Sequence, residues 1–165
     1  MDSRYEGERH LKTNHTLYII PSGKPKIWDR NPELGSTKAN EAYTGTFHRL
    51  CQQYVKQFSD PWVVISPKYG LLRPDDEVKG TYDLSFNIKR NPEVISIETM
   101  KQQLDDKGLQ HFSNIIMLGG KKFKPIMNQL YSNAQVSFPL HGTKGIGDMQ
   151  RILKQAIEKG QKISK

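Results

Sequence analysis

The stretch Trp62-Val-Val-Ile-Ser66, bounded by Pro61 and Pro67, indicates a short buried strand. Valine and isoleucine favour strands, and the run lacks the polar alternation of a strand that is exposed on one side. It follows the clearest amphipathic helix of the chain, in which apolar residues recur at helical spacing between residues 47 and 58. A buried strand after such a helix is typical of an α/β protein.

The same alternation continues on both sides of this stretch. Strands that alternate with helices predict right-handed crossovers and a parallel sheet that is covered on both faces. We therefore expect a single three-layer α/β domain over residues 15–165, with a mostly parallel sheet of four or slightly more strands. A flexible tail is expected over residues 1–14. The other expected strands are 16–20, 115–118 and 134–138, the other helices are 96–108, 123–131 and 149–157, and the long loops are 21–43 and 67–94.

Composition limits the class of protein. Hydrophobic residues make up 35% of the 165 residues and charged residues 25%, which favours a polar but globular chain. No apolar run approaches the ~18 residues of a membrane span. The segment 1–14 is polar and lacks the apolar core of a signal peptide, so we expect a cytoplasmic protein.

Cys51 is the single cysteine and lies on the apolar stripe of the helix at 47–58. It cannot form an internal disulfide or a site with several thiolates, so we expect a small buried hydrophobic residue. The histidines are scattered along the sequence, and we expect neither a metal nor a cofactor.

The formal net charge is +8, which favours polyanionic partners such as nucleotides or nucleic acid. The alternative is that the basic C-terminal end is solvated surface. The sequence does not predict the oligomeric state.

Loops after the strands are the expected binding site, because ligands of open parallel sheets bind beyond the carboxyl ends of the strands. Four such loops are expected on one edge of the sheet: 21–29, 66–76, 119–124 and 139–147. Their charged residues are mostly basic. They are Lys24, Lys26, Lys68, Arg73, Lys121, Lys122, Lys124 and Lys144, with Asp29, Asp75 and Asp76 as the acids.

Glycines beside the strand ends let backbone N–H groups approach an anion closely. The alternative is that these glycines only allow the chain to turn. No GxxxxGK[ST] sequence is present, which argues against a P-loop. The candidate phosphate-binding residues here are Ser22, Gly23, Lys24, Lys26, Gly119, Gly120 and Lys121.

The sequence Ser66-Pro-Lys-Tyr-Gly70 is the most distinctive local feature. Lys68 is a candidate for binding phosphate, and Tyr69 for stacking on a base or donating a hydrogen bond. The alternative is that Tyr69 packs against the protein and Lys68 is solvated.

Candidates for acid–base chemistry are Asp29, Asp76, Asp83 and His141, each at or after an expected strand end. A turn or cap role is the alternative for each acid, and a structural role for the histidine.

These motifs resemble an uncharacterised bacterial and phage domain family. Its members carry a serine- and lysine-rich loop after the first strand, then Ser-Ala-Lys-Tyr-Gly-Leu, then a Tyr-Asp pair. The matching residues are Ser66-Pro-Lys-Tyr-Gly-Leu71 and Tyr82-Asp83, and the resemblance spans residues 16–147. This chain departs from the pattern at Pro67, and in the first loop, which lacks a Ser-Cys-Ser-Lys string. The layout is distantly similar to the uracil-DNA-glycosylase-type fold and to peroxide-stress proteins, a likeness that implies a fold and not a function.

The leading hypothesis is a hydrolase that acts on the N-glycosidic bond of a nucleotide or nucleic acid. In it the lysines hold phosphate, Tyr69 or Trp28 stacks on the base, Asp83 or Asp29 assists a water molecule or the sugar, and His141 contacts the leaving base. The alternatives are a nucleotide- or nucleic-acid-binding module without catalysis, and an interaction domain for an acidic protein.

Overall fold

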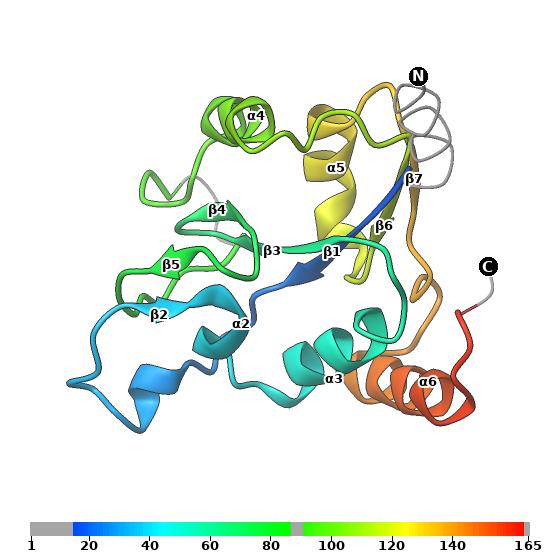
Figure 1. The fold of residues 1–165 in the computed structure, drawn as a ribbon, viewed down its shortest axis with the longest axis horizontal. Helices are drawn as coiled ribbons and strands as arrows, with labels where there is room; N and C mark the ends of the chain where they lie inside the picture. The colour runs from blue at the N-terminus through cyan, green and yellow to red at the C-terminus, as the bar shows by residue number, and fades with distance from the viewer. Residues whose placement is uncertain (1–14, 87–90, 164–165) are drawn as a thin grey trace, which may run out of the picture.

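The computed structural model describes residues 15–86 and 91–163, so the expected tail at 1–14 lies outside the described residues. Strand β1 (Thr16–Pro21) is the centre of a five-stranded sheet with the order β4-β3-β1-β6-β7 (Figure 1). Strands β1, β3, β6 and β7 are parallel, and β4 is antiparallel to β3. The other four strands are β3 (Trp62–Ser66), β4 (Gly70–Leu72), β6 (Asn114–Met117) and β7 (Gln135–Ser137).

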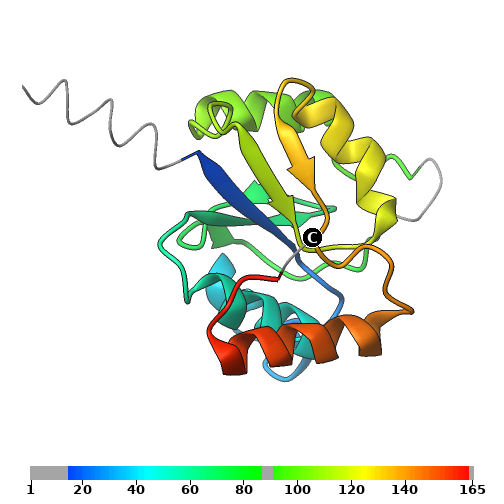
Figure 2. The same ribbon diagram turned by 90° about the vertical axis from the view of Figure 1, so that its right-hand side faces the viewer.

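Helices cover both faces of this sheet (Figure 2). Successive side chains of a strand point to opposite faces, so β1 contributes Tyr18 and Ile20 to one core and Leu17 and Ile19 to the other. The first core contains residues of α3 (Thr46–Val55) and α6 (Ile146–Lys159). The second core contains residues of α4 (Ile97–Asp106) and α5 (Lys124–Leu130), which confirms the predicted three-layer α/β architecture.

The two long loops expected from the sequence contain short elements, so the prediction that they are irregular is wrong in part. Strands β2 (Thr37–Lys38) and β5 (Glu77–Val78) form a small antiparallel sheet. The 3-10 helix η1 (Ile27–Asp29) and helix α2 (Ala39–Ala42) lie in the first long loop and precede α3. Outside the long loops, a second 3-10 helix, η2 (Lys121–Phe123), precedes α5. Elements of two to four residues are too short to show a hydrophobic period.

The distinctive sequence Ser66–Gly70 forms the tight turn between β3 and β4. The Ser66 hydroxyl oxygen accepts hydrogen bonds from the backbone N–H groups of Lys68 (3.1 Å) and Tyr69 (3.0 Å). Gly70 adopts φ 77°, and a Cβ atom there would lie 2.2 Å from the side-chain oxygen of Gln103. The motif residues Ser66 and Gly70 therefore specify a turn.

Side chains of α4 and of the residue after it bind the outer edge of β4. Gln103 accepts a hydrogen bond from Leu71 N (2.9 Å) and donates one to Tyr69 O (2.8 Å). Lys107 donates to Leu71 O and forms an ion pair with Asp76, each at 2.7 Å. These contacts join the edge strand to the helix that covers it.

Cys51 is fully buried in the first core, and this burial raises the pKa of its thiol, which confirms its predicted structural role. Within residues 15–86 and 91–163, no helix has the length and apolar character needed to cross a membrane.

Candidate functional site

A cavity of about 680 Å³ opens at the carboxyl edge of the parallel strands. Its lining comes from segments that are far apart in the sequence: the exits of β1 and β6, the start of α6, and the segment at residues 83–86. Strand β1 has β3 on one side and β6 on the other, so the chain order reverses between β1 and β6. The cavity lies at this switch point, where open α/β sheets bind their ligands. The lining residues are Pro21, Ser22, Gly23, Lys24, Phe47, Ile65, Pro67, Asp83, Leu84, Ser85, Phe86, Gly119, Gly120, Lys121, Lys122, Phe123, Ile146 and Met149.

The exit of β1 forms one side of the cavity. The backbone N–H of Ser22 donates to Ile65 O (3.1 Å), which extends the pairing of β1 with β3 by one residue. Gly23 then adopts φ 83°, a backbone conformation that favours glycine, and turns the chain so that exposed Lys24 follows at the rim. The side chain of Ser22 is only 4% exposed.

The exit of β6 forms the adjacent side. After Gly119 and Gly120 the chain enters η2, where Lys121 and Lys122 reach the surface and Phe123 is buried. Partial burial lowers the pKa of Lys122, whose ammonium group lies 5.5 Å from the Phe123 ring centroid. Lys24, Lys121 and Lys122 therefore make this part of the cavity basic.

The remaining wall is largely apolar. Phe86 packs edge to face against Phe123, with ring centroids 5.8 Å apart. Phe47 from the first turn of α3 and Met149 from the first turn of α6 also line the cavity. Asp83 begins this wall and is the one carboxylate among the described residues that line the cavity. A ligand here would meet both cations and aromatic rings.

A cluster of hydroxyl groups lies beside the turn after β3. The Tyr82 hydroxyl lies 2.7 Å from Ser66 Oγ and 2.7 Å from the Tyr43 hydroxyl. Burial raises the pKa of the Tyr82 phenol. The cluster joins the turn after β3 to Tyr82, the residue before Asp83 of the cavity lining.

A buried histidine supports the end of β1. The ring of His48 is 1% exposed, with Nδ1 2.7 Å from Pro21 O and Nε2 2.8 Å from the side-chain nitrogen of Gln52. Burial lowers the pKa of His48 to about 4, so the ring is neutral at pH 7. Neutral His48 then donates from Nδ1 to Pro21 and accepts at Nε2 from Gln52.

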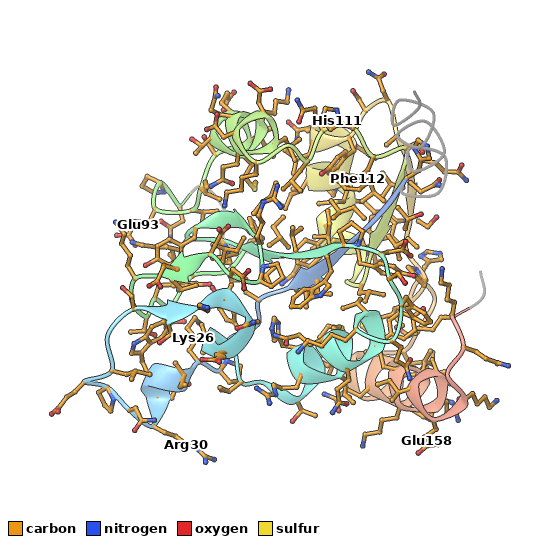
Figure 3. All side chains as sticks on the ribbon, in the orientation of Figure 1. Lys26, Arg30, Glu93, His111, Phe112 and Glu158 are labelled. Atoms are coloured by element: carbon orange, nitrogen blue, oxygen red, sulfur yellow. The ribbon has the colours of Figure 1, made fainter. Side chains whose placement is uncertain are left out.

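The structure brings together a subset of the site residues predicted from the sequence. Ser22, Gly23, Lys24, Gly119, Gly120, Lys121 and Asp83 line the one cavity. Two further candidates, Ser66 and Lys26, lie in the protein interior and are 0% and 3% exposed. The ammonium group of Lys26 donates to Lys24 O (2.8 Å), so this lysine holds the loop instead of facing a ligand. Figure 3 shows the contrast between Lys26, inside the outline of the molecule, and Arg30, which points outward.

Two residues were expected to stack on a base. Trp28 is 5% exposed, and its indole N–H donates to Leu34 O (2.8 Å). Tyr69 is partly exposed, packs edge to face on Tyr82 and donates its hydroxyl proton to Gly80 O (3.2 Å). Neither ring lines the cavity, and the burial of Trp28 keeps its ring from stacking on a ligand.

The sequence left open whether Asp29, Asp83 and His141 converge, and of these three only Asp83 lines the cavity. Asp29 caps η1 by accepting a hydrogen bond from Lys26 N (2.9 Å). His141 lies exposed beside a separate shallow depression lined by Lys124 and residues 136–138. Lys68 is exposed in the β3–β4 turn and does not line the cavity.

The predicted position of the loop at 66–76 is also wrong in part. Strand β4 runs antiparallel to β3, so residues beyond Leu72 return away from the carboxyl edge. Asp76 instead pairs with Lys107, just after the end of α4. The expectation that all four loops lie wholly on one edge is therefore wrong for Arg73, Asp75 and Asp76.

Sequence reasoning missed the apolar wall and did not select Lys122 as a binding residue. Phe47, Phe86, Phe123 and Met149 have the residue types of core positions, and periodicity does not separate a core phenylalanine from one that lines a cavity. The available signal was that Phe47 and Met149 lie in the first turns of α3 and α6 and that Phe123 follows the exit of β6, whereas Phe86 gave no such signal.

No group of three or more histidine, cysteine or acidic side chains that could hold a metal ion occurs within the described ranges. The cavity lining, with a single carboxylate, is not a metal-binding set.

Comparison with known proteins identifies the family. Residues 31–155 match DUF6884, which is described as a family of unknown function, and the chain belongs to it. The chain is similar to an uncharacterised protein, YfjM, of Bacillus subtilis (strain 168). The two are 41% identical over 148 residues, which cover 89% of this chain and 98% of that relative.

Proposed function

We propose that this protein acts on a nucleotide, either free or within a nucleic acid, and that the cavity at the β1–β6 switch point binds its phosphate and base. One observation supports this more than any other: a single cavity joins three lysines to an aromatic wall. The lysines are Lys24, Lys121 and Lys122, and the rings are Phe47, Phe86 and Phe123.

The basic side fits a phosphate group. Lysine ammonium groups form charge-assisted hydrogen bonds with phosphate oxygens, and Gly119 and Gly120 line the cavity beside Lys121. The net charge of +8 adds a long-range attraction for polyanions.

The aromatic side fits a base. Phenylalanine rings stack on bases of any sequence, because every base has a π-face. The volume of about 680 Å³ is within the range of small-ligand sites. A ligand that carries a phosphate and a flat apolar ring therefore matches the residue types of this lining.

Asp83 gives the cavity a group for hydrolysis of the N-glycosidic bond. In this reaction water adds to C1′ of the sugar, the C–N bond breaks, and the base leaves with a proton. We propose that the Asp83 carboxylate orients the water or stabilises the positive charge that develops on the sugar. His141, which is outside the cavity, has no part in this step.

Binding without chemistry is the second candidate. It is favoured by the lining itself, which has one carboxylate, Asp83, and no histidine among the described residues. Acid–base catalysis usually needs a second group to protonate the leaving base.

Binding and cleavage are tested with the same samples. Nucleoside monophosphates and a short single-stranded DNA are titrated calorimetrically, and free base is measured by chromatography after incubation. Lys121→Met should weaken binding by roughly tenfold, since a charge-assisted contact is lost. Lys154→Met on the outer side of α6 is the matched control and should bind as the parent does. If the parent binds no nucleotide and no DNA, the proposal is wrong, and an interaction domain for an acidic protein becomes the leading hypothesis.

A further inference from the structure

We infer that the ligand of the cavity is part of a nucleic-acid strand with unpaired bases, and that the next nucleotide of this strand binds in a second depression beside the cavity. This inference deepens the proposed function and rests on it for the nucleotide nature of the ligand. The second depression has a volume of about 280 Å³, and its lining residues are Lys124, Val136, Ser137, Phe138 and His141. None of these residues takes part in the reaction proposed for Asp83.

The cavity and the second depression are neighbours on one edge of the sheet. Phe123 lines the cavity, and the next residue, Lys124, lines the second depression. The Cα atoms of adjacent residues are about 3.8 Å apart, so the two sites meet at this point of the chain. Strand β7 runs parallel to β6, so its end, which Phe138 follows, lies at the same edge. A ligand that fills the cavity can therefore continue into the second depression.

The segment between β7 and α6 also borders both sites. His141 lines the second depression and Ile146 lines the cavity, with residues 142–145 between them. Exposed Lys144 lies in this connection, so the chain that joins the two sites carries a further cation. Ile146 is 59% exposed, which extends the apolar lining to the mouth of the cavity. Two separate segments, one after β6 and one after β7, thus contribute residues to both sites.

Each site places a lysine ammonium group beside a phenylalanine ring. In the cavity, the Lys122 Nζ lies 5.5 Å from the Phe123 ring centroid. In the second depression, the Lys124 Nζ lies 5.7 Å from the Phe138 ring centroid. A nucleotide consists of an anionic phosphate and a flat base, which such a cation and such a ring can bind together. Two of these pairs side by side therefore match two successive nucleotides.

A strand uses both sites, whereas a free mononucleotide would use the cavity alone. The next phosphate of a strand would lie near Lys124, where Ser137 and exposed His141 can form hydrogen bonds with phosphate or sugar. A base inside a duplex is paired and stacked, so the cavity admits only an unpaired base. The carboxylates of an acidic protein would match the lysines but would not use the rings. The chemistry of the two sites thus favours single-stranded nucleic acid.

The experiment compares one nucleotide with two. The probes are the deoxynucleoside 5′-monophosphates and the 5′-phosphorylated dinucleotides of a single base, and calorimetric titration measures their affinities. The parent should bind the dinucleotide roughly tenfold more tightly than the monophosphate of the same base, because the second phosphate adds a charge-assisted contact. The matching ribonucleotides, titrated in parallel, show whether the strand is DNA or RNA.

Substitutions in the second depression should remove this preference. Lys124→Met should lower the dinucleotide affinity roughly tenfold, whereas the mononucleotide affinity should stay within roughly twofold of the parent, because Lys124 does not line the cavity. Phe138 packs against the second core, and Phe138→Leu keeps an apolar side chain there while it removes the ring. This change should lower the dinucleotide affinity by roughly threefold to tenfold. Thermal unfolding establishes that each variant is folded.

Lys101→Met is the matched control. Lys101 is exposed on α4 and lines neither site, and its replacement removes the same charge from the protein. The affinities of this variant for both probes should match the parent within roughly twofold. Equal losses in Lys101→Met and Lys124→Met would show that the overall charge causes the preference, and would overturn the second site.

The outcomes separate this inference from the proposed function. Equal affinities of the parent for the monophosphate and the dinucleotide would overturn the strand and leave the nucleotide function in place. A preference for the dinucleotide that persists in Lys124→Met would overturn the second depression as its source. Displacement of the dinucleotide by an equal concentration of hexaglutamate would overturn the strand in favour of an acidic protein, and no binding of any probe would overturn both proposals.

Discussion

The ammonium group of Lys26 lies 4.3 Å from the centroid of the Tyr82 ring, and its second contact is the backbone oxygen of Lys24 at 2.8 Å. One buried cation thus joins the loop that follows β1 to the segment that leads into Asp83. Burial lowers the pKa of Lys26, whereas the charges of Asp29 and Asp83 act in the opposite direction. The lysine is a structural link between two sides of the cavity.

Replacement of this link should reduce stability. Lys26→Met leaves Lys24 O without its donor and removes the contact with the Tyr82 ring, so the free energy of unfolding should fall by ~1–3 kcal/mol. Urea unfolding measures the change. Lys24→Met is the matched control, because exposed Lys24 should change stability by less than ~0.5 kcal/mol yet weaken phosphate binding. Equal stability losses in the two variants would contradict this division of roles.

Asp83→Asn separates catalysis from binding. The change keeps the shape and removes the negative charge, so a catalytic carboxylate should lower turnover by ~10²-fold or more while nucleotide affinity changes little. The measurement is base release beside calorimetric binding. Asp75→Asn, remote from the cavity lining, should leave both values unchanged. If Asp83→Asn unfolds the protein, the residue is a structural turn and its catalytic role is wrong.

Binding of nucleic acid should depend steeply on salt. Lysines at the cavity rim displace counterions from the phosphate backbone, so the logarithm of the affinity should fall linearly with the logarithm of the salt concentration. Lys121→Gln should reduce the magnitude of this slope by about one, the effect of one phosphate contact. Fluorescence anisotropy with a labelled oligonucleotide measures both slopes. A salt-insensitive complex would point to a small-molecule ligand or a protein partner.

His48 should make the stability depend on pH. Its pKa is about 4 in the folded protein against an ordinary value of 6.5, so the unfolded chain binds more protons between these values. Stability is therefore fully present above pH 6.5 and is lost as the pH falls toward 4. A shift of this size corresponds to a loss of about 3 kcal/mol.

Urea unfolding at pH 7 and pH 4.5 tests this effect. His48→Asn retains a donor for Pro21 but has no titrating ring, so it should be less stable at pH 7 and lose less stability on acidification. His141→Asn, at an exposed histidine, should keep the pH dependence of the parent. An unchanged pH dependence in His48→Asn would show that other groups cause it.

A substitution at Gly70 tests whether the sequence Ser66–Gly70 specifies the turn between β3 and β4. Gly70→Ala places a Cβ at φ 77° and 2.2 Å from the Gln103 side-chain oxygen. The backbone conformation alone should cost ~1–2 kcal/mol, and displacement of Gln103 should add to this loss. Gly80→Ala, where a Cβ meets nothing within 4 Å, should change stability by less than ~0.5 kcal/mol. Similar unfolding midpoints for the two variants would contradict the turn assignment.

The architecture could be predicted because it depends on long-range patterns of hydrophobicity. The strands β1, β3 and β6 each contain an apolar run, β7 lies in the alternating segment 134–138, and alternation with helices predicted their parallel arrangement. The antiparallel β4 was missed, because Gly70-Leu-Leu72 is too short to distinguish from a loop. This one omission placed Asp75 and Asp76 on the wrong edge.

The site could be predicted only in part, for a related reason. The rule that ligands bind beyond strand ends found Ser22, Gly23, Gly119, Gly120 and Lys121. It could not show which side chains at a strand end turn inward. Lys26 and Ser66 are polar in sequence but buried in the fold, because local hydrogen-bond partners compensate for their burial.

The attachment of α4 to β4 determines which strand of the sheet another molecule could reach. An unpaired sheet edge is a template for strand addition and aggregation. At β4, the N–H and C=O of Leu71 are already bound by Gln103 and Lys107 of the same chain, so a foreign strand would have to displace both side chains. Self-association by sheet extension is therefore blocked at Leu71 of this edge strand.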